Sequence, residues 1–157
     1  MNPKLDRLLA SLEPGSAENL ALRLRFGFAC ALRVKHLLED PEVIACLEAF
    51  AGAVRTEGPA ADLATLTART DELAHRHQGS RSLDGVGHAA VSATYTCAKA
   101  IAGKARQAAE YGAYAAVYGQ GGYGATSDPS AFEPEYEWQA IQLERLLSES
   151  HVARSAA

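Results

Sequence analysis

Large apolar residues recur at helical spacing in the first third of the chain. Leu20, Leu24 and Phe28 stand four residues apart, and apolar positions three or four apart line one face of an α-helix. Ser16 precedes this stripe, and serine is a residue type that accepts hydrogen bonds from the free backbone amides at a helix start. We therefore expect a helix over residues 17–38.

Further apolar stripes follow, each bounded by residues that start or end helices. Asp40-Pro41-Glu42 offers a cap, a first-turn proline and a first-turn acid, the order in which a helix begins. Gly58-Pro59 would end that helix. The remaining pattern predicts a short helix at 3–12, a helix at 63–77, a linker at 79–85, a Gly- and Pro-rich loop at 119–134 and a final helix at about 134–149.

Residues 86–118 stand apart because they are small and apolar. One unbroken helix of this length would be about 50 Å long, too long for a compact domain of this size. Glycine inside a helix costs about 1 kcal/mol relative to alanine, so we expect a break near Gly103, although the pattern leaves open whether the segment is one helix or two. Small residues recur every fourth position in two rows, Ala105/Ala109/Ala113 and Ala108/Gly112/Ala116.

Together these patterns predict an all-α fold. No segment alternates between apolar and polar residues for long enough to form a sheet strand. Rows of small residues let helix backbones approach closely, so we place residues 86–118 at the centre. The expected architecture is one domain, residues 1–157, of about five to seven antiparallel helices around a central helical pair rich in small residues.

Composition narrows the classes of protein that fit. The chain has 157 residues, 32 of them alanine, with 22% charged residues and a net charge of −4, so it is neither disordered nor basic. The negative charge argues against nucleic acid as a partner. No stretch of about 18 apolar residues and no basic-plus-apolar leader is present, so we expect a cytoplasmic protein without a membrane span.

Acidic charge is concentrated at the C-terminal end. Residues 128–157 hold six acids and two bases, next to Tyr136 and Trp138. Charge steers the encounter of two proteins and aromatic side chains anchor it, so this helix is a candidate site for a basic partner protein. The alternative is a capped, solvated terminal helix with a buried tryptophan. The candidate partner-binding residues are Glu133, Glu135, Glu137, Trp138 and Glu144.

Catalytic and metal-binding chemistry has weaker sequence support. Glu72 and His75 form one Glu-x-x-His pair, whereas a di-iron bundle needs two such pairs and two further glutamates. Glu72, His75, His77 and His88 therefore remain the only alternative metal site, in a small metal-dependent enzyme. Gly119–Gly124 has the letters of a dinucleotide-binding loop but follows a helix instead of a strand. We expect no cofactor and no catalytic residue.

Several segments resemble a family of immunity proteins from bacterial polymorphic toxin systems. The similarity covers an early helix ending in an acid before proline at 28–41 (FACALRVKHLLEDP), the helix at 45–55 (ACLEAFAGAVR), a Gly-His-Ala helix at 87–94 (GHAAVSAT), an Ala-Tyr-Ala turn at 113–116 and a closing helix from 135–139 (EYEWQ). The resemblance implies a helical protein that binds and neutralises a cognate toxin without catalysis of its own. It transfers no functional residue. A structural homo-oligomer joined through the alanine-rich pair is the remaining alternative.

Overall fold

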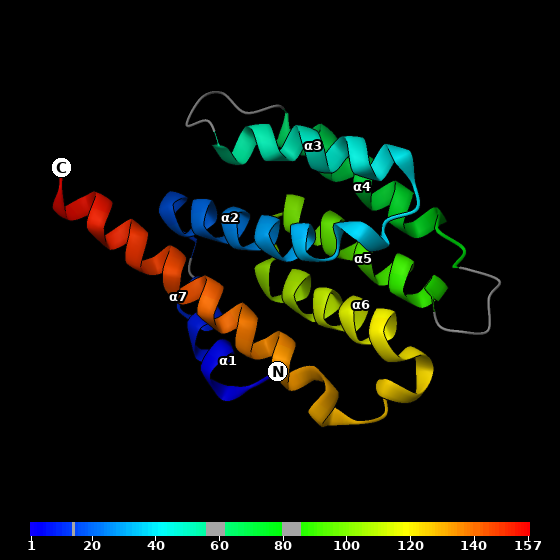
Figure 1. Cartoon of the computed structure of the whole chain (residues 1–157). Helices are drawn as coiled ribbons and strands as arrows, with labels where there is room; N and C mark the ends of the chain where they lie inside the picture. The colour runs from blue at the N-terminus through cyan, green and yellow to red at the C-terminus, as the bar shows by residue number, and fades with distance from the viewer. Residues whose placement is uncertain (14, 56–61, 80–85) are drawn as a thin grey trace.

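The described part of the chain is built from α-helices joined by turns (Figure 1). The computed structural model describes residues 1–13, 15–55, 62–79 and 86–157, and these contain seven α-helices, two short 3-10 helices and no β-strand. The all-α fold class is thereby confirmed. The elements are α1 (Pro3–Ala10), α2 (Ala17–Arg33), η1 (Lys35–Leu37), α3 (Pro41–Arg55), α4 (Leu63–Arg76), α5 (Val86–Ile101), α6 (Ala105–Ala125), η2 (Pro129–Phe132) and α7 (Glu133–Ser155).

Side-chain caps fix where the first helices begin. Ser16 Oγ accepts a hydrogen bond from the Asn19 backbone amide at 3.0 Å, and Asp40 Oδ1 accepts one from the Glu42 amide at 2.8 Å. Both interactions satisfy amides that have no partner inside the helix. The predicted starts of α2 and α3 are confirmed, whereas the stop at Gly58-Pro59 and linker residues 80–85 lie outside the described residues.

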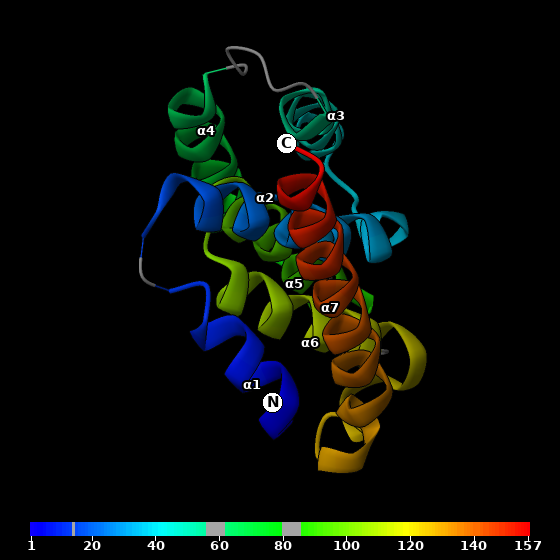
Figure 2. The same ribbon diagram turned by 90° about the vertical axis from the view of Figure 1, so that its left-hand side faces the viewer.

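The alanine-rich segment forms two helices, α5 and α6, that lie side by side at the centre of the molecule (Figures 1 and 2). The break falls where it was expected, because α5 ends at Ile101, α6 begins at Ala105, and Gly103 between them has a φ of +69°. This left-handed conformation suits glycine, which has no Cβ to clash with the backbone. Residues 86–118 therefore belong to two helices and not to one.

Alanine side chains make α6 part of two separate cores. Ala109 and Ala113 pack in a cluster with residues of α1, α2 and α7, whereas Ala108 packs with residues of α3, α4 and α5. All three have an exposed fraction of 0%. Because these rows are buried within one chain, they are not available as the interface of a homo-oligomer.

Helix α2 links the centre to the outer helices. It packs against α5 and α6, with α3 and α4 on one side and α1 and α7 on the other (Figures 1 and 2). At Gly27 the approach to α5 is so close that a Cβ would stand 2.9 Å from the Cα of Ala100. The outer helices therefore surround a centre in which backbones nearly touch, and α7 lies at the edge.

The expected loop at 119–134 is wrong. Helix α6 continues to Ala125, with one non-helical residue at Gly122 (φ 63°, ψ −155°), and η2 and the start of α7 occupy most of what remains. Gly119 serves a close helix contact, because a Cβ there would lie 3.2 Å from Leu37 Cδ2. The glycines of this segment therefore do not form a long loop. Gly119 allows close packing and Gly122 forms a sharp kink.

Other boundaries differ from expectation at the helix ends. The helix expected over 17–38 stops at Arg33 and gives way to the 3-10 turn η1. The final helix begins at Glu133 and runs to Ser155 rather than to about 149, and its last turns project beyond the body of the molecule (Figure 1). Within the described residues, the helices lack the combination of length and apolar character that crossing a membrane requires.

Candidate functional site

Two of the expected partner-binding residues on α7 bind an arginine of the same chain. Arg33 Nε and Nη2 donate to the two carboxylate oxygens of Glu135 at 2.9 and 2.8 Å, and the Arg33 Cζ lies 4.4 Å from the centre of the Trp138 ring. The side chain of Glu135 is only 7% exposed. Its hydrogen bonds with Glu135 raise the pKa of Arg33, as expected for a charge-assisted pair. Glu135 and Trp138 therefore attach α7 to α2.

Two further acids of α7 also have partners within the chain. Glu144, the third expected partner-binding residue with an internal role, pairs with Lys4 of α1 at 2.9 Å. Glu149 pairs with Arg25 of α2 at 2.8 Å. These pairs are partly exposed, and such pairs contribute little to stability on their own. They orient α7 against α1 and α2. Acidic side chains that the sequence pattern suggested for binding a partner protein therefore pair within the chain.

Glu133 and Glu137 remain on the outer side of α7. Both side chains are exposed, and neither makes a hydrogen bond or ion pair with another of the described residues. They lie in the first two turns of α7, where a negative charge is favoured by the partial positive charge of the helix N-terminus. Of the five expected residues, these two carry exposed carboxylates that are not in an ion pair with another described residue.

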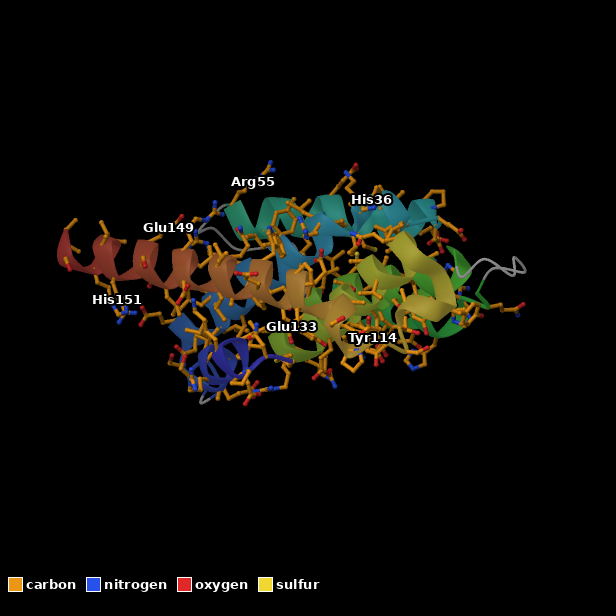
Figure 3. The ribbon with its side chains drawn as sticks, turned by 60° about the horizontal axis from the view of Figure 1, so that its bottom comes forward. His36, Arg55, Tyr114, Glu133, Glu149 and His151 are labelled. Atoms are coloured by element: carbon orange, nitrogen blue, oxygen red, sulfur yellow. The ribbon has the colours of Figure 1, made fainter. Side chains whose placement is uncertain are left out.

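A cavity of about 410 Å³ opens beside Glu133, and we call it the α6–α7 pocket. The ring centre of Tyr114 on α6 lies 4.9 Å from that of Phe132, which stacks on Tyr136 at 6.0 Å. Glu133 and Tyr114 lie close together on one side of the molecule (Figure 3). The lining residues are Met1, Tyr114, Thr126, Pro129, Phe132, Glu133 and Tyr136.

Carboxylates lie close to the aromatic rings of this pocket. Burial is the main cause that raises the pKa of Tyr136, and the nearby Tyr114, Glu110 and Glu133 raise it further. Negative neighbours disfavour the phenolate. Met1, which carries the N-terminal ammonium group, also lines the pocket. An aromatic surface combined with carboxylates attracts cations.

Aromatic side chains continue along α6 beyond the pocket. The ring of Tyr123 lies 5.9 Å from Tyr118 and 4.6 Å from His88 of α5, because the kink at Gly122 turns the end of α6 back toward these residues. Tyr114 and Tyr123 are 43% and 49% exposed. We define the acidic–aromatic face as the four exposed residues Tyr114, Tyr123, Glu133 and Glu137.

Sequence reasoning missed the tyrosines of this face. The candidate partner-binding residues predicted from sequence all lie between 133 and 144, and Tyr123 falls in the predicted loop at 119–134. The spacing of Tyr111, Tyr114 and Tyr118 by three and four residues was the available signal, since such positions share one helix face. That signal could not show which face of α6 remains uncovered.

The alternative metal ligands do not come together. His75 stacks edge-on against Tyr95, His77 lies 3.9 Å from Glu39, and His88 stacks on Tyr118. Glu72 pairs with Arg69 and Arg76. No group of three or more His, Cys, Asp or Glu side chains within the described ranges is placed to hold a metal ion. The hypothesis of a metal site at these four residues is therefore not supported.

The three cysteines are buried thiols. Cys97 has an exposed fraction of 0%, and burial raises its pKa to about 12. Burial, followed by the charge of Glu135, also raises the pKa of Cys30. A thiol reacts as its thiolate, so neither residue presents a reactive sulfur at neutral pH.

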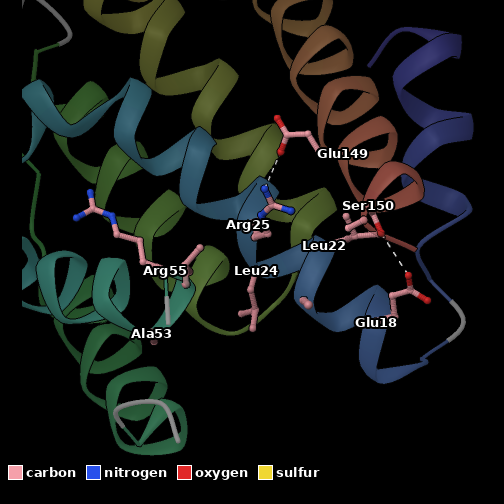
Figure 4. A pocket seen from close by; sticks show the side chains of 11 residues that line it. Glu18, Leu22, Leu24, Arg25, Ala53, Arg55, Glu149 and Ser150 are labelled. Atoms are coloured by element: carbon pink, nitrogen blue, oxygen red, sulfur yellow. Dashed lines mark hydrogen bonds and ion pairs between the residues drawn. The ribbon is translucent and has the colours of Figure 1, made fainter. Parts of the chain in front are cut away.

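A larger groove of about 670 Å³ lies between α2, α3 and the end of α7 (Figure 4). Arg25 pairs with Glu149 across it, and Ser150 Oγ donates to Glu18 at 3.3 Å. Much of the remaining lining is alanine and leucine. Because most of its charged groups already have partners in the chain, this groove offers less binding chemistry than the α6–α7 pocket.

Comparison of the chain with models of protein families, with curated proteins and with solved structures finds no match.

Proposed function

We propose that this protein is a non-catalytic binding module that holds a basic partner protein on its acidic–aromatic face. The resemblance of its helices to immunity proteins suggests the partner class, a cognate bacterial toxin domain that the bound protein neutralises. The observation that carries the proposal is the exposed carboxylate of Glu133 beside the half-exposed ring of Tyr114. The exposed Glu137 follows about one turn later on α7, and the half-exposed Tyr123 is linked to Tyr114 through the ring of Tyr118.

This combination of side chains fits protein recognition. Tyrosine supplies large contact area with a polar hydroxyl and is enriched at protein interfaces. Exposed carboxylates attract a basic surface and speed its approach. Both kinds of group stand on helices that are fixed by the cores beneath them, so little order has to be gained on binding.

The first test is protection of a host by the protein. The gene would be co-expressed with the toxin gene that neighbours it in its native genome, and cell survival would be measured. We expect survival with the intact protein. Killing that continues despite soluble, folded protein, for each neighbouring toxin gene, would contradict the immunity function.

The second test asks whether the acidic–aromatic face makes the contact. The double change Glu133→Lys/Glu137→Lys should slow association with the purified toxin domain by about tenfold at low salt and weaken the salt dependence. Glu13→Lys/Glu48→Lys, at two exposed acids away from this face, changes the net charge by the same amount and should leave the rate within about twofold. Equal rates for all three proteins would place the interface elsewhere.

A further inference from the structure

Helix α7 carries two glutamate–aromatic pairs with the same spacing. Glu135 and Trp138 are three residues apart, and so are Glu133 and Tyr136. Side chains separated by three positions lie next to one another on a helix surface. The two pairs differ in their rings, because Tyr136 is buried and stacks on Phe132. Beside Glu133 the exposed ring is that of Tyr114 on α6, which lines the same pocket.

The first pair shows what this arrangement binds. The guanidinium of Arg33 lies over the Trp138 ring at 4.4 Å while it donates two hydrogen bonds to Glu135. A planar cation is thus held both by a ring face and by a bidentate carboxylate, a geometry that guanidinium satisfies and ammonium does not. The molecule itself contains an arginine bound in this way.

Glu133 of the second pair makes no ion pair with another side chain of the described residues, although Met1, which carries the N-terminal ammonium group, also lines the pocket beside it. Glu133 is exposed, and the α6–α7 pocket beside it has a volume of about 410 Å³. Arg106 contacts the Met1 sulfur at the edge of this pocket, but it is already paired with Asp6. The half-exposed ring of Tyr114, which packs edge-on against Phe132, and the carboxylate of Glu133 therefore border the same cavity, and no arginine or lysine side chain is among the residues that line it.

We infer that the α6–α7 pocket binds an arginine side chain of the partner protein, with the guanidinium against Tyr114 and paired with Glu133. The inference rests on the proposed function, because it names the side chain that the acidic–aromatic face recognises. It follows from charge complementarity: the pocket has an aromatic wall, and the two acids Glu133 and Glu110, both close enough to act on Tyr136, outnumber the single ammonium group of Met1. Lysine could reach the carboxylate but would lose the stacked, bidentate contact.

The experiment uses a probe in place of the unidentified partner. The full chain would be titrated with N-acetyl-arginine methylamide and followed by NMR, with the citrulline analogue as the uncharged, nearly isosteric comparison. We expect weak, saturable shifts confined to the pocket for the arginine probe, with a dissociation constant on the order of millimolar. The citrulline analogue should bind at least about fivefold more weakly.

Matched variants assign the site. Glu133→Gln and Tyr114→Leu should each weaken binding of the arginine probe by about fivefold or more. Glu137→Gln and Tyr123→Leu change the same residue types on the same face but outside the pocket, and they should leave the affinity within about twofold. Glu133 is exposed, so Glu133→Gln tests the inference even if Tyr114→Leu disturbs the fold.

Three outcomes would overturn the inference. Absence of saturable chemical-shift changes with the arginine probe would show that the pocket does not bind arginine. Equal binding of the citrulline analogue would show that the positive charge is not recognised. N-acetyl-lysine methylamide would be titrated in the same way, and its equal binding would make the pocket a general cation site instead of an arginine site. Because no toxin is present, arginine binding together with failed protection would leave this inference standing and contradict only the immunity function.

Discussion

The α5–α6 pair and α7 are held in place by different physical means. In α6, Ala108, Ala109 and Ala113 are fully buried, and the helix is packed on both sides. Helix α7 buries one side through residues such as Leu143 and is further attached by the Arg33–Glu135 ion pair. Close packing of small residues fixes the centre, whereas a few directional contacts fix the edge.

This difference teaches where the molecule has freedom to carry function. A larger side chain on the inner faces of α5 or α6 must move a backbone, because interiors are packed without spare volume. On the outer side of α7, Glu133 and Glu137 can be changed without disturbing a core. The face that is least constrained by folding is therefore the face that we assign to binding.

The largest effect is expected from enlarging a small residue of the central pair. Ala108→Leu adds three carbon atoms at a fully buried position and should lower the free energy of unfolding by about 3 kcal/mol. Ser148→Leu makes a similar addition on the exposed side of α7 and should change it by less than about 0.5 kcal/mol. Urea unfolding measures both, and equal effects would mean that the centre is not packed more closely than the edge.

A smaller loss is expected from breaking the ion pair that attaches α7. Arg33→Met leaves the Glu135 carboxylate buried without a partner, which should cost about 2 kcal/mol, less than for a fully buried pair because Arg33 is 39% exposed. The double change Arg33→Met/Glu135→Met should recover most of that loss. A double-mutant cycle by urea unfolding separates the pair interaction from the single effects. Simple additivity would contradict the directional attachment.

A still smaller loss of stability is expected from changing the turn between α5 and α6. Gly103→Ala places a Cβ at a φ of +69° and 3.0 Å from Leu20 Cδ1, so we expect a loss of about 1–2 kcal/mol. Gly52→Ala in α3 meets no atom within 4 Å and should stabilise the protein by about 0.5 kcal/mol. A lower midpoint of thermal unfolding for Gly103→Ala and a higher one for Gly52→Ala would support these assignments. A stable Gly103→Ala variant would show that the turn tolerates another conformation.

The smallest effect concerns the titration of Tyr136 at the edge. Its pKa is raised by burial first and by Tyr114, Glu110 and Glu133 after that. Because folding raises the pKa of Tyr136, its neutral phenol contributes to the free energy of unfolding at pH values below about 10, the pKa of an unperturbed tyrosine. This contribution is lost as the pH rises through the pKa of Tyr136 in the folded protein. Glu133→Gln should lower the pKa of Tyr136 slightly, and Glu137→Gln should leave it unchanged.

NMR of isotope-labelled tyrosine rings during a titration to alkaline pH measures this shift. A pKa that does not move in Glu133→Gln would separate Glu133 electrostatically from the pocket. It would also weaken the structural basis for arginine binding there.

The elements that sequence predicted best are those with local causes. Ser16 and Asp40 cap the helices that follow them, and these interactions form between residues two or three positions apart. Gly103 breaks the alanine-rich segment because helix propensity acts residue by residue. The apolar stripes gave helices α2 to α4 with errors of a few residues at their ends.

The candidate site was predicted only in part, because its composition depends on partners distant in sequence. Glu135 and Glu133 are indistinguishable as acids of the same helix turn, yet Arg33, 102 positions away, covers the first and leaves the second exposed. The sequence predicts a loop at Gly119, because its neighbour Leu37 cannot be inferred from local sequence.

The helical class, the capped helix starts and the break in the alanine-rich segment can be predicted from local sequence, since each follows from interactions within a few residues. Packing between helices sets which charges of α7 pair within the chain, which tyrosines of α6 stay exposed, and the separation of the four candidate metal ligands. Burial and ion pairing depend on contacts between helices that the chain brings together only when it folds.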